Sequence, residues 1–438
     1  MFSPLPSSRS TTSLSGVATV SKLASASMTD SENTATPPSG LHRAWVVAFA
    51  GAAAVFCGLG LARFAFGMML PSMSASLGLN YSQGGLLGFA NMAGYLVAVL
   101  MTPLVLPRIG TRMAMTAGLI LIALSMLGMA LSERFLALCA LYVLTGIGSG
   151  AVVLPAMSLM SPWFHPSHRG LAAGIVMSGP GFGIILTGFV VPQLVPFHGL
   201  LSWQTGWLVF AIITCLVAIL TCALIRNHPH ESGHLPYGRV AQAPLTQASA
   251  SPRAGRARLL AHLGLIFAIY GATYMLYVTF IVTSMVDNFA MSQAGAGELW
   301  AWFGFLSIFS GVLFGWISDR IGRRAGMGLA FAALASAYLL VGFGTWMPGL
   351  YVSIILFGLA AWGVPVIMAA SAGDYFGPAG AANALAALTL AFSAGQALGP
   401  VGAGLLAERT GDFSTSYAAA GAAAVVAILL ITLLKAPR

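Results

Sequence analysis

Long apolar stretches are the feature that most constrains this chain. Twelve of them follow one another along the chain, and each has about 20 residues, enough to cross a hydrocarbon core about 30 Å thick. Apolar residues make up 58% of the 438 positions and charged residues only 7%, too few to cover a soluble domain. The sequence therefore predicts an all-α, multi-pass membrane protein. The stretches run over about 44–70, 82–106, 113–132, 135–160, 170–195, 203–225, 261–286, 295–318, 326–346, 349–372, 382–406 and 417–435.

The two halves of the chain repeat one another. The tripeptide Arg108-Ile109-Gly110 returns as Arg320-Ile321-Gly322, 212 residues further on, and the same offset maps Phe164 onto Phe376. One offset at separate places indicates a duplicated unit. Six spans before the middle and six after it therefore predict two pseudo-symmetric six-helix bundles, an architecture typical of secondary transporters with a site between the halves.

These observations divide the chain into four parts. Residues 1–42 are rich in Ser, Thr and Pro without an apolar core, so we expect a disordered cytoplasmic tail, within which Met28 is an alternative start. The two bundles are expected over 43–226 and 259–438. Between them, residues 227–258 form a hydrophilic linker.

The placement of basic residues predicts the orientation. Of 19 Lys and Arg, 16 fall in the tails or in the gaps after the second, fourth, sixth and eighth spans, whereas Arg134 and Arg409 lie in loops on the other side. The positive-inside rule then makes both termini and the linker cytoplasmic. Since no soluble segment has a basic face with interleaved aromatics, nucleic acid is not an expected partner.

One loop carries a family resemblance. The segment Gly315-Trp-Ile-Ser-Asp319-Arg-Ile-Gly-Arg-Arg324 is similar to the Gly-x-x-x-Asp-Arg-x-Gly-Arg-Arg/Lys motif of the major facilitator superfamily. More narrowly, Gly58-Leu-Gly-Leu-Ala-Arg63-Phe64, Leu70-Pro71 and Asn91-x-x-Gly94-Tyr95-Leu96 resemble the YbfB/YjiJ-like branch. The resemblance implies a secondary transporter, which we expect as a monomer in a bacterial plasma (inner) membrane.

The resemblance also implies that this loop is a conformational latch. Asp319 is then expected to meet the start of the fifth span, around residues 169–171, when the cytoplasmic ends are together, because a helix N-terminus stabilises a carboxylate. The first copy of the loop has Pro107 at the corresponding position, so gating is expected to be asymmetric. The alternative is that the arginines only set the topology. The residues assigned to the latch are Gly315, Asp319, Arg320, Gly322, Arg323 and Arg324.

Arg63 is the sharpest candidate for a substrate site. It is the only Asp, Glu, Lys, Arg or His well inside a predicted span. A charge at that depth costs several kcal/mol and is a functional hypothesis by default. With no Asp or Glu predicted in the membrane core, a carboxylate substrate is a natural counter-ion for the guanidinium. The alternative is that Arg63 snorkels to the external surface, roughly 10 Å away at 1.5 Å per residue.

Uncharged polar residues complete the predicted site. Asn91 and Tyr95 are one helical turn apart and share a face of the second span, and Gln396 lies in the eleventh. Tyr274 is the central member of a tyrosine stripe in the seventh span, which faces either the cavity or the lipid.

Two Gly-Pro steps lie in corresponding spans. Gly179-Pro180 is in the fifth span and Gly399-Pro400 in the eleventh. Small residues allow close helix packing and proline bends a helix, so we interpret both steps as hinge or packing elements.

Together these features predict a secondary active transporter of a small organic anion, a carboxylate, working by alternating access. Efflux of hydrophobic or cationic compounds and a ligand sensor without turnover are the alternatives. The expected partners are the solute, the lipid bilayer and a coupling proton or counter-substrate, and Asp287, Glu298 and Asp374 are the acids at the membrane boundary that could carry a proton. Without a nucleotide, metal or nucleophile motif, we expect no enzyme activity, cofactor or metal.

Overall fold

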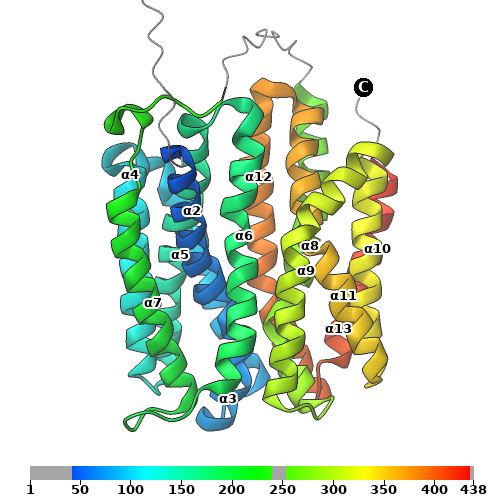
Figure 1. The fold of residues 1–438 in the computed structure, drawn as a ribbon. Helices are drawn as coiled ribbons and strands as arrows, with labels where there is room; N and C mark the ends of the chain where they lie inside the picture. Colours follow the sequence, from blue (N-terminus) through cyan, green and yellow to red (C-terminus); the bar gives the residue numbers. More distant parts are fainter. Residues whose placement is uncertain (1–41, 239–252, 435–438) are drawn as a thin grey trace, which may run out of the picture. The chain divides into compact units, whose positions relative to one another are not determined.

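The computed structural model describes residues 42–238 and 253–434 (Figure 1). The predicted disordered tail and the middle of the predicted linker lie outside the described residues. The chain from Arg43 onward forms one compact unit, in which the described ranges contain helices and no β-strand. The long helices are α2 (Arg43–Val55), α3 (Ala65–Leu77), α4 (Tyr81–Ala130), α5 (Phe135–Trp163), α6 (Pro166–Val190), α7 (Ser202–Leu224), α8 (Arg253–Asp287), α9 (Gln293–Ile321), α10 (Arg323–Gly342), α11 (Met347–Ala360), α12 (Gly363–Thr410) and α13 (Ser414–Thr432). The short ones are the π-helix η1 (Phe56–Phe64) and the 3-10 turns η2 (Val191–Gln193) and η3 (Pro229–Ser232).

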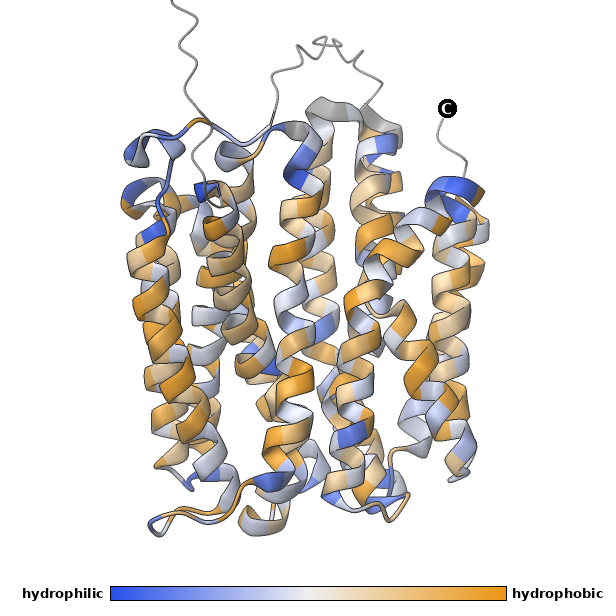
Figure 2. Cartoon of the chain, in the orientation of Figure 1, coloured by the Kyte–Doolittle hydropathy of each residue, from blue (hydrophilic) through white to orange (hydrophobic). Residues whose placement is uncertain are grey.

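Twelve membrane spans result. Among the described residues, eleven helices are long and apolar enough to cross a membrane, and α4 is one of them. Gly110 interrupts α4 with φ 75° and ψ 164°, so α4 contains two spans joined by a sharp corner. The predicted all-α fold with twelve spans is confirmed. Figure 2 shows hydrophobic residues along most of the span lengths and hydrophilic residues gathered towards their ends.

The repeated Arg-Ile-Gly builds the same corner twice. Gly322, between α9 and α10, has φ 89° and ψ 154°, close to the values at Gly110. A positive φ is easy only for glycine, so the duplicated glycine fixes how the second and third spans of each half are joined. We call the end of the bundle that carries these two corners the basic end, and the other end the opposite end.

Two spans are irregular inside the bundle. The first span runs through α2, η1 and α3, with the π-helix at its middle. The tenth span runs through α11 and the first part of α12, with a break at Ala361 and Trp362. Broken backbone at membrane depth is tolerated where protein buries it or where it lines a cavity.

Close helix contacts join the two halves near the opposite end. Helix α3 packs against α8, α4 against α12, and α6 against α9. A Cβ added at Gly67 would lie 2.5 Å from the Val278 oxygen, and one added at Gly404 would lie 2.5 Å from the Tyr81 oxygen. Such small residues let helix backbones touch, so the halves are tightly joined there.

Hydrogen bonds strengthen this closure. The Tyr81 amide donates to Glu408 Oε2 at 3.1 Å, and the Tyr81 hydroxyl donates to Asp287 Oδ2 at 3.4 Å. Deeper in the bundle, Trp300 Nε1 donates to Thr187 Oγ1 at 3.1 Å. These three contacts each connect one half to the other.

The basic end has fewer described contacts between the halves than the opposite end. In the first turns of α6, Gly170 and Leu171 are exposed, and a Cβ added at Gly170 or Gly174 would meet no atom within 4 Å. The described contacts between the halves thus concentrate at the opposite end, while the start of α6 remains free.

Candidate functional site

Arg63 lies at the end of the π-helix η1. A π-helix has a wider turn than an α-helix and is often found at functional sites. It is accommodated by close packing, since a Cβ added at Gly60 would lie 2.7 Å from the Cα of Gly183 in α6. Only 5% of the Arg63 surface is exposed, and Arg63 is the only Lys, Arg, His, Asp or Glu among the described residues that is buried.

The guanidinium of Arg63 is held without being neutralised. Its carbon lies 4.5 Å from the centre of the Tyr95 ring, a cation–π contact from α4. Arg63 Nε and Nη2 are buried and have no hydrogen-bond partner among the described residues. This burial is incompatible with snorkelling to water. Unpartnered donors on a buried cation are costly, and an anion that accepted both hydrogen bonds would remove that cost.

Tyr142 of α5 connects Arg63 to Asn91. Its hydroxyl donates to the Arg63 carbonyl oxygen at 3.4 Å, and its own carbonyl oxygen accepts from Asn91 Nδ2 at 3.3 Å. Asn91 is 1% exposed, so its amide is interior. The sequence analysis missed Tyr142, because a single tyrosine inside an apolar span gives no signal of its depth.

The tyrosine stripe of α8 faces the protein interior. Tyr270, Tyr274 and Tyr277 are at most 1% exposed, which excludes the lipid-facing interpretation. The Tyr270 hydroxyl donates to the Ala361 oxygen, and the Tyr277 and Ser353 hydroxyls are 2.7 Å apart. The Tyr274 hydroxyl is buried and has no hydrogen-bond partner among the described residues, so Tyr274 is the member of the stripe that is free to bind a solute.

The break in the tenth span brings Trp362 to the same place. Its backbone N–H donates to Ser310 Oγ at 3.0 Å, which satisfies an amide that the broken helix leaves free. The Trp362 ring is half-buried and lies 6.1 Å from Phe64 and 5.8 Å from Tyr274, measured between ring centres. The sequence analysis also missed Trp362, although the glycine and proline in Trp362-Gly-Val-Pro inside an apolar stretch are a signal of a broken span.

Gln396 brings a third helix to the boundary between the halves. It is 3% exposed, and its Oε1 has no described partner. Met92, Met275 and Ala397 follow Asn91, Tyr274 and Gln396 in sequence and form one small hydrophobic cluster. The three helices that carry these polar residues therefore meet at one level. Five fully buried atoms of the predicted site lack a described hydrogen-bond partner: Arg63 Nε and Nη2, Asn91 Oδ1, Tyr274 Oη and Gln396 Oε1.

The two Gly-Pro steps are packing points between corresponding helices. A Cβ at Gly179 would lie 2.5 Å from the Ala52 oxygen, so α6 touches α2 there, and Gly399 makes the same approach to Ala272 of α8. Pro400 also meets Gly85 of α4 in the other half. Movement at these steps stays a prediction.

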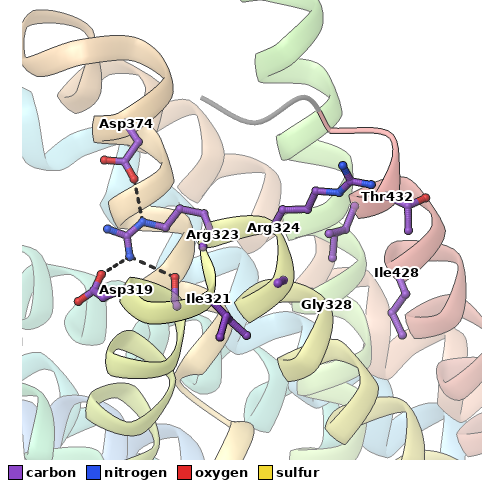
Figure 3. Close-up of a pocket in the computed structure, with 12 residues that line it drawn as sticks. Asp319, Ile321, Arg323, Arg324, Gly328, Asp374, Ile428 and Thr432 are labelled. Atoms are coloured by element: carbon purple, nitrogen blue, oxygen red, sulfur yellow. Dashed lines mark hydrogen bonds and ion pairs between the residues drawn. The ribbon is translucent and has the colours of Figure 1, made fainter. Parts of the chain in front are cut away.

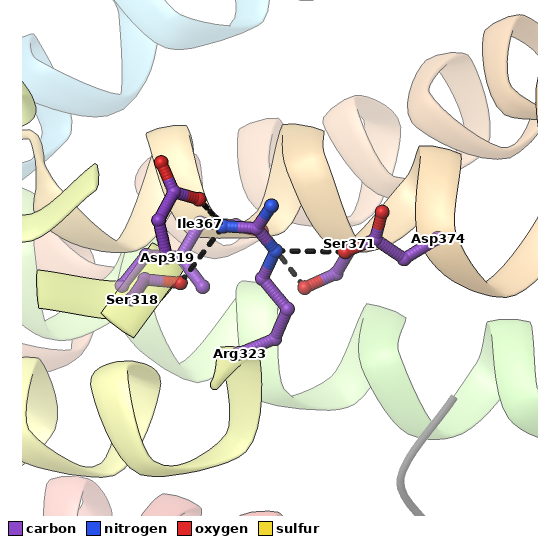
Figure 4. A network of polar contacts seen from close by, with 6 residues as sticks. All are labelled: Ser318, Asp319, Arg323, Ile367, Ser371 and Asp374. Carbon is purple, nitrogen blue, oxygen red and sulfur yellow. Dashed lines mark hydrogen bonds and ion pairs between the residues drawn. The ribbon is translucent and has the colours of Figure 1, made fainter. Parts of the chain in front are cut away.

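Two of the predicted latch residues, Asp319 and Arg323, form an ion-pair network with Asp374 at the basic end (Figure 4). Arg323 Nη1 lies 2.5 Å from Asp319 Oδ1, and Arg323 Nε lies 2.7 Å from Asp374 Oδ2. Arg323 also donates to Ser318 Oγ at 3.1 Å, and the Arg320 guanidinium lies 3.9 Å from the Trp316 ring centre. The network thus joins α9, α10 and α12 within one half.

Asp319 has its described partner in its own half and is exposed, as is the start of α6. Its predicted contact with residues 169–171 is not formed in this conformation, in which the basic end is the freer one. A surface pocket of about 650 Å³ lies beside the network (Figure 3). There Arg324 extends towards Thr432 of α13.

Twelve spans in two related halves, with a buried guanidinium where the halves meet, define a multi-pass membrane transporter. The chain belongs to the family described as "Uncharacterised MFS-type transporter YbfB", whose model matches residues 55–432. This confirms the resemblance to the major facilitator superfamily and places the chain among transporters, not enzymes.

Several curated proteins and a solved structure that resemble this chain are also transporters. The chain is 22% identical to a hexuronate transporter of Bacillus subtilis (strain 168) over 85% of this chain and 90% of that one. It is 24% identical to the 4-hydroxybenzoate transporter PcaK of Pseudomonas aeruginosa over 66% of this chain and 68% of that one. The fold matches a bacterial homologue of the human lysosomal transporter Spinster, solved in an inward-facing and unoccupied conformation, with a TM-score of 0.67, 16% identity and coverage of 89% and 95%.

Proposed function

We propose that this transporter carries a small organic anion with a carboxylate group and that Arg63 binds the carboxylate. The observation that carries the proposal is the buried Arg63 guanidinium, with Nε and Nη2 lacking described partners. Two nitrogens of one guanidinium can bind both oxygens of a carboxylate in a planar, bidentate arrangement.

The printed substrates of the relatives support an anion. A hexuronate and 4-hydroxybenzoate both carry a carboxylate, although they are substrates of other proteins at 22% and 24% identity. Cation efflux lacks comparable support, since no Asp or Glu is among the buried residues that the structure describes.

Alternating access is the proposed mechanism. The contacts of Tyr81 with Glu408 and Asp287 hold the opposite end together here, so we expect a solute to reach Arg63 from the freer basic end. In the other state these contacts break and Asp319 meets the start of α6, which closes the basic end. If the basic end is cytoplasmic, as the sequence predicts, the present conformation is inward-facing.

The positions of the acidic residues at the membrane boundary bear on whether transport is coupled to protons. Of the boundary acids, Asp287 contacts Tyr81, Asp374 pairs with Arg323, and Glu298 lines an apolar pocket between α6 and α9. None of the three has a described contact with Arg63, so we favour exchange or gradient-driven transport over direct proton competition at the site.

A ligand-stabilisation screen tests the proposal. Carboxylates, neutral amides and lipophilic cations are compared for their effect on thermal unfolding of the purified protein and of Arg63→Ala. A carboxylate at 100 times its Kd should stabilise the wild type by about 2.7 kcal/mol. It should leave Arg63→Ala unchanged, while Arg134→Ala, at an exposed loop position, keeps the response. Equal stabilisation of the wild type and Arg63→Ala by carboxylates would contradict the proposal.

A further inference from the structure

We infer that the Arg63 site accepts an aromatic monocarboxylate. This inference rests on the proposed function and narrows it to one substrate class. Two observations carry it: the number of buried charges around the site and a row of aromatic rings that begins beside Arg63 in sequence.

The charge inventory limits the ligand to one anionic group. Arg63 is the only cationic residue among the buried residues described, and one guanidinium pairs with one carboxylate. A second carboxylate on the ligand would lie in the interior without a cation. An unpaired buried charge is strongly unfavourable, so dicarboxylates should bind much more weakly than monocarboxylates.

Four aromatic rings form a continuous row that starts at Phe64, the sequence neighbour of Arg63. We call this row the aromatic wall and define it as Phe64, Trp362, Tyr274 and Phe357. Ring centres are 6.1 Å apart for Phe64 and Trp362, 5.8 Å for Tyr274 and Trp362, and 5.6 Å for Tyr274 and Phe357. Three of these rings belong to the second half, whereas Phe64 adjoins Arg63 in sequence. Trp362 is the half-buried ring of the wall, and it lies between Phe64 of the first half and Tyr274 of the second. We therefore expect a flat aromatic body attached to the bound carboxylate to stack on Trp362.

Three matched ligands test the inference by calorimetric titration of the full-length protein. Benzoate and cyclohexanecarboxylate have the same size and charge but differ in the ring, and benzene-1,4-dicarboxylate adds one charge to benzoate. We expect benzoate to bind about 2- to 10-fold more tightly than cyclohexanecarboxylate. It should bind at least about 10-fold more tightly than the dicarboxylate.

Trp362→Leu provides the matched variant, because it keeps an apolar side chain and removes the ring. It should reduce the preference for benzoate over cyclohexanecarboxylate towards 1, while Trp346→Leu, at an exposed position outside the site, should leave the preference unchanged. Circular dichroism and size-exclusion profiles establish that both variants are folded.

The outcomes separate this inference from the proposed function. Equal, Arg63-dependent binding of benzoate and cyclohexanecarboxylate, or tighter binding of the dicarboxylate, would overturn the inference and leave the carboxylate site standing. Carboxylate binding that survives Arg63→Ala would overturn the proposed function itself.

Discussion

The Arg63 guanidinium lies over the Tyr95 ring, with its carbon 4.5 Å from the ring centre. The ring face attracts the cation but accepts no strong hydrogen bond from it, so Arg63 Nε and Nη2 stay available. A carboxylate in place of Tyr95 would have neutralised the charge. The pair thus explains how one buried cation can be both positioned and free to bind an anion.

Arg63 should lower the stability of the ligand-free protein. Arg63→Met replaces a buried, partly unpaired cation by an apolar side chain of similar length, so we expect an increase of about 1–3 kcal/mol in the free energy of unfolding. Carboxylate binding should be lost in the same variant. Thermal unfolding with and without benzoate measures both effects.

The exposed control Arg134→Met should change stability by less than about 0.5 kcal/mol and retain binding. A destabilised Arg63→Met protein would show that the guanidinium is a structural element with partners of its own.

The crossing of η1 and α6 should be sensitive to one methyl group. In Gly183→Ala the new Cβ would clash with the Cα of Gly60, so we expect a loss of about 1–3 kcal/mol. Gly174→Ala in the same helix meets open space and should gain up to about 1 kcal/mol from helix propensity. Thermal unfolding of both variants measures the two changes in stability. Equal changes in stability would contradict the close crossing of η1 and α6.

The contact of Tyr81 with Glu408 should help to keep the opposite end closed. Thr283, which is 3% exposed and lines the pocket beside Asp287, is a suitable reporter when replaced by cysteine in a cysteine-free background. Glu408→Ala removes a hydrogen bond to a charged acceptor, so labelling of Thr283→Cys by a membrane-impermeant maleimide should become about 2- to 10-fold faster.

The loop variant Glu133→Ala serves as the control and should leave the rate unchanged. If Glu408→Ala also leaves it unchanged, the contact does not contribute to closure.

The predicted latch requires Asp319 to approach the start of α6 in the other state. Cysteines replacing Asp319 and Gly170 should then form a disulfide under oxidation in actively transporting vesicles, because the bond needs Cα atoms within about 7 Å. Transport should stop on oxidation and recover with reductant. A control pair with cysteines at Asp319 and Ser202, at opposite ends of the bundle, should not cross-link. Active transport without any cross-link at Asp319 and Gly170 would contradict the latch.

The spans and the repeat could be predicted because they depend on local sequence. About twenty consecutive apolar residues are long enough to form a membrane-spanning helix whatever the rest of the chain does. Gly110 and Gly322 share a backbone conformation that only glycine adopts easily. Arg63 could be predicted from the sequence for the same reason, because a single charged residue in an apolar stretch is evident without a structure.

The partners of Arg63 could not be predicted in the same way. The π-helix around Arg63 changes which residues share its face, and the α-helical period used for the sequence does not include such an insertion. Tyr142 and Trp362 reach the site through helix crossings and a broken span, which depend on contacts between distant segments. The ion pairs of Arg323 likewise belong to one conformation, and a sequence does not specify which state is observed.

Counterflow in proteoliposomes is the most direct measurement of the central claim. Vesicles preloaded with an unlabelled carboxylate that stabilises the protein are placed in a trace of the same compound in labelled form. Wild-type protein should accumulate label transiently, and Arg63→Met, reconstituted at equal density, should show no accumulation above protein-free vesicles. Equal accumulation by both proteins would contradict the role of Arg63, and saturable binding without accumulation by the wild type would contradict transport.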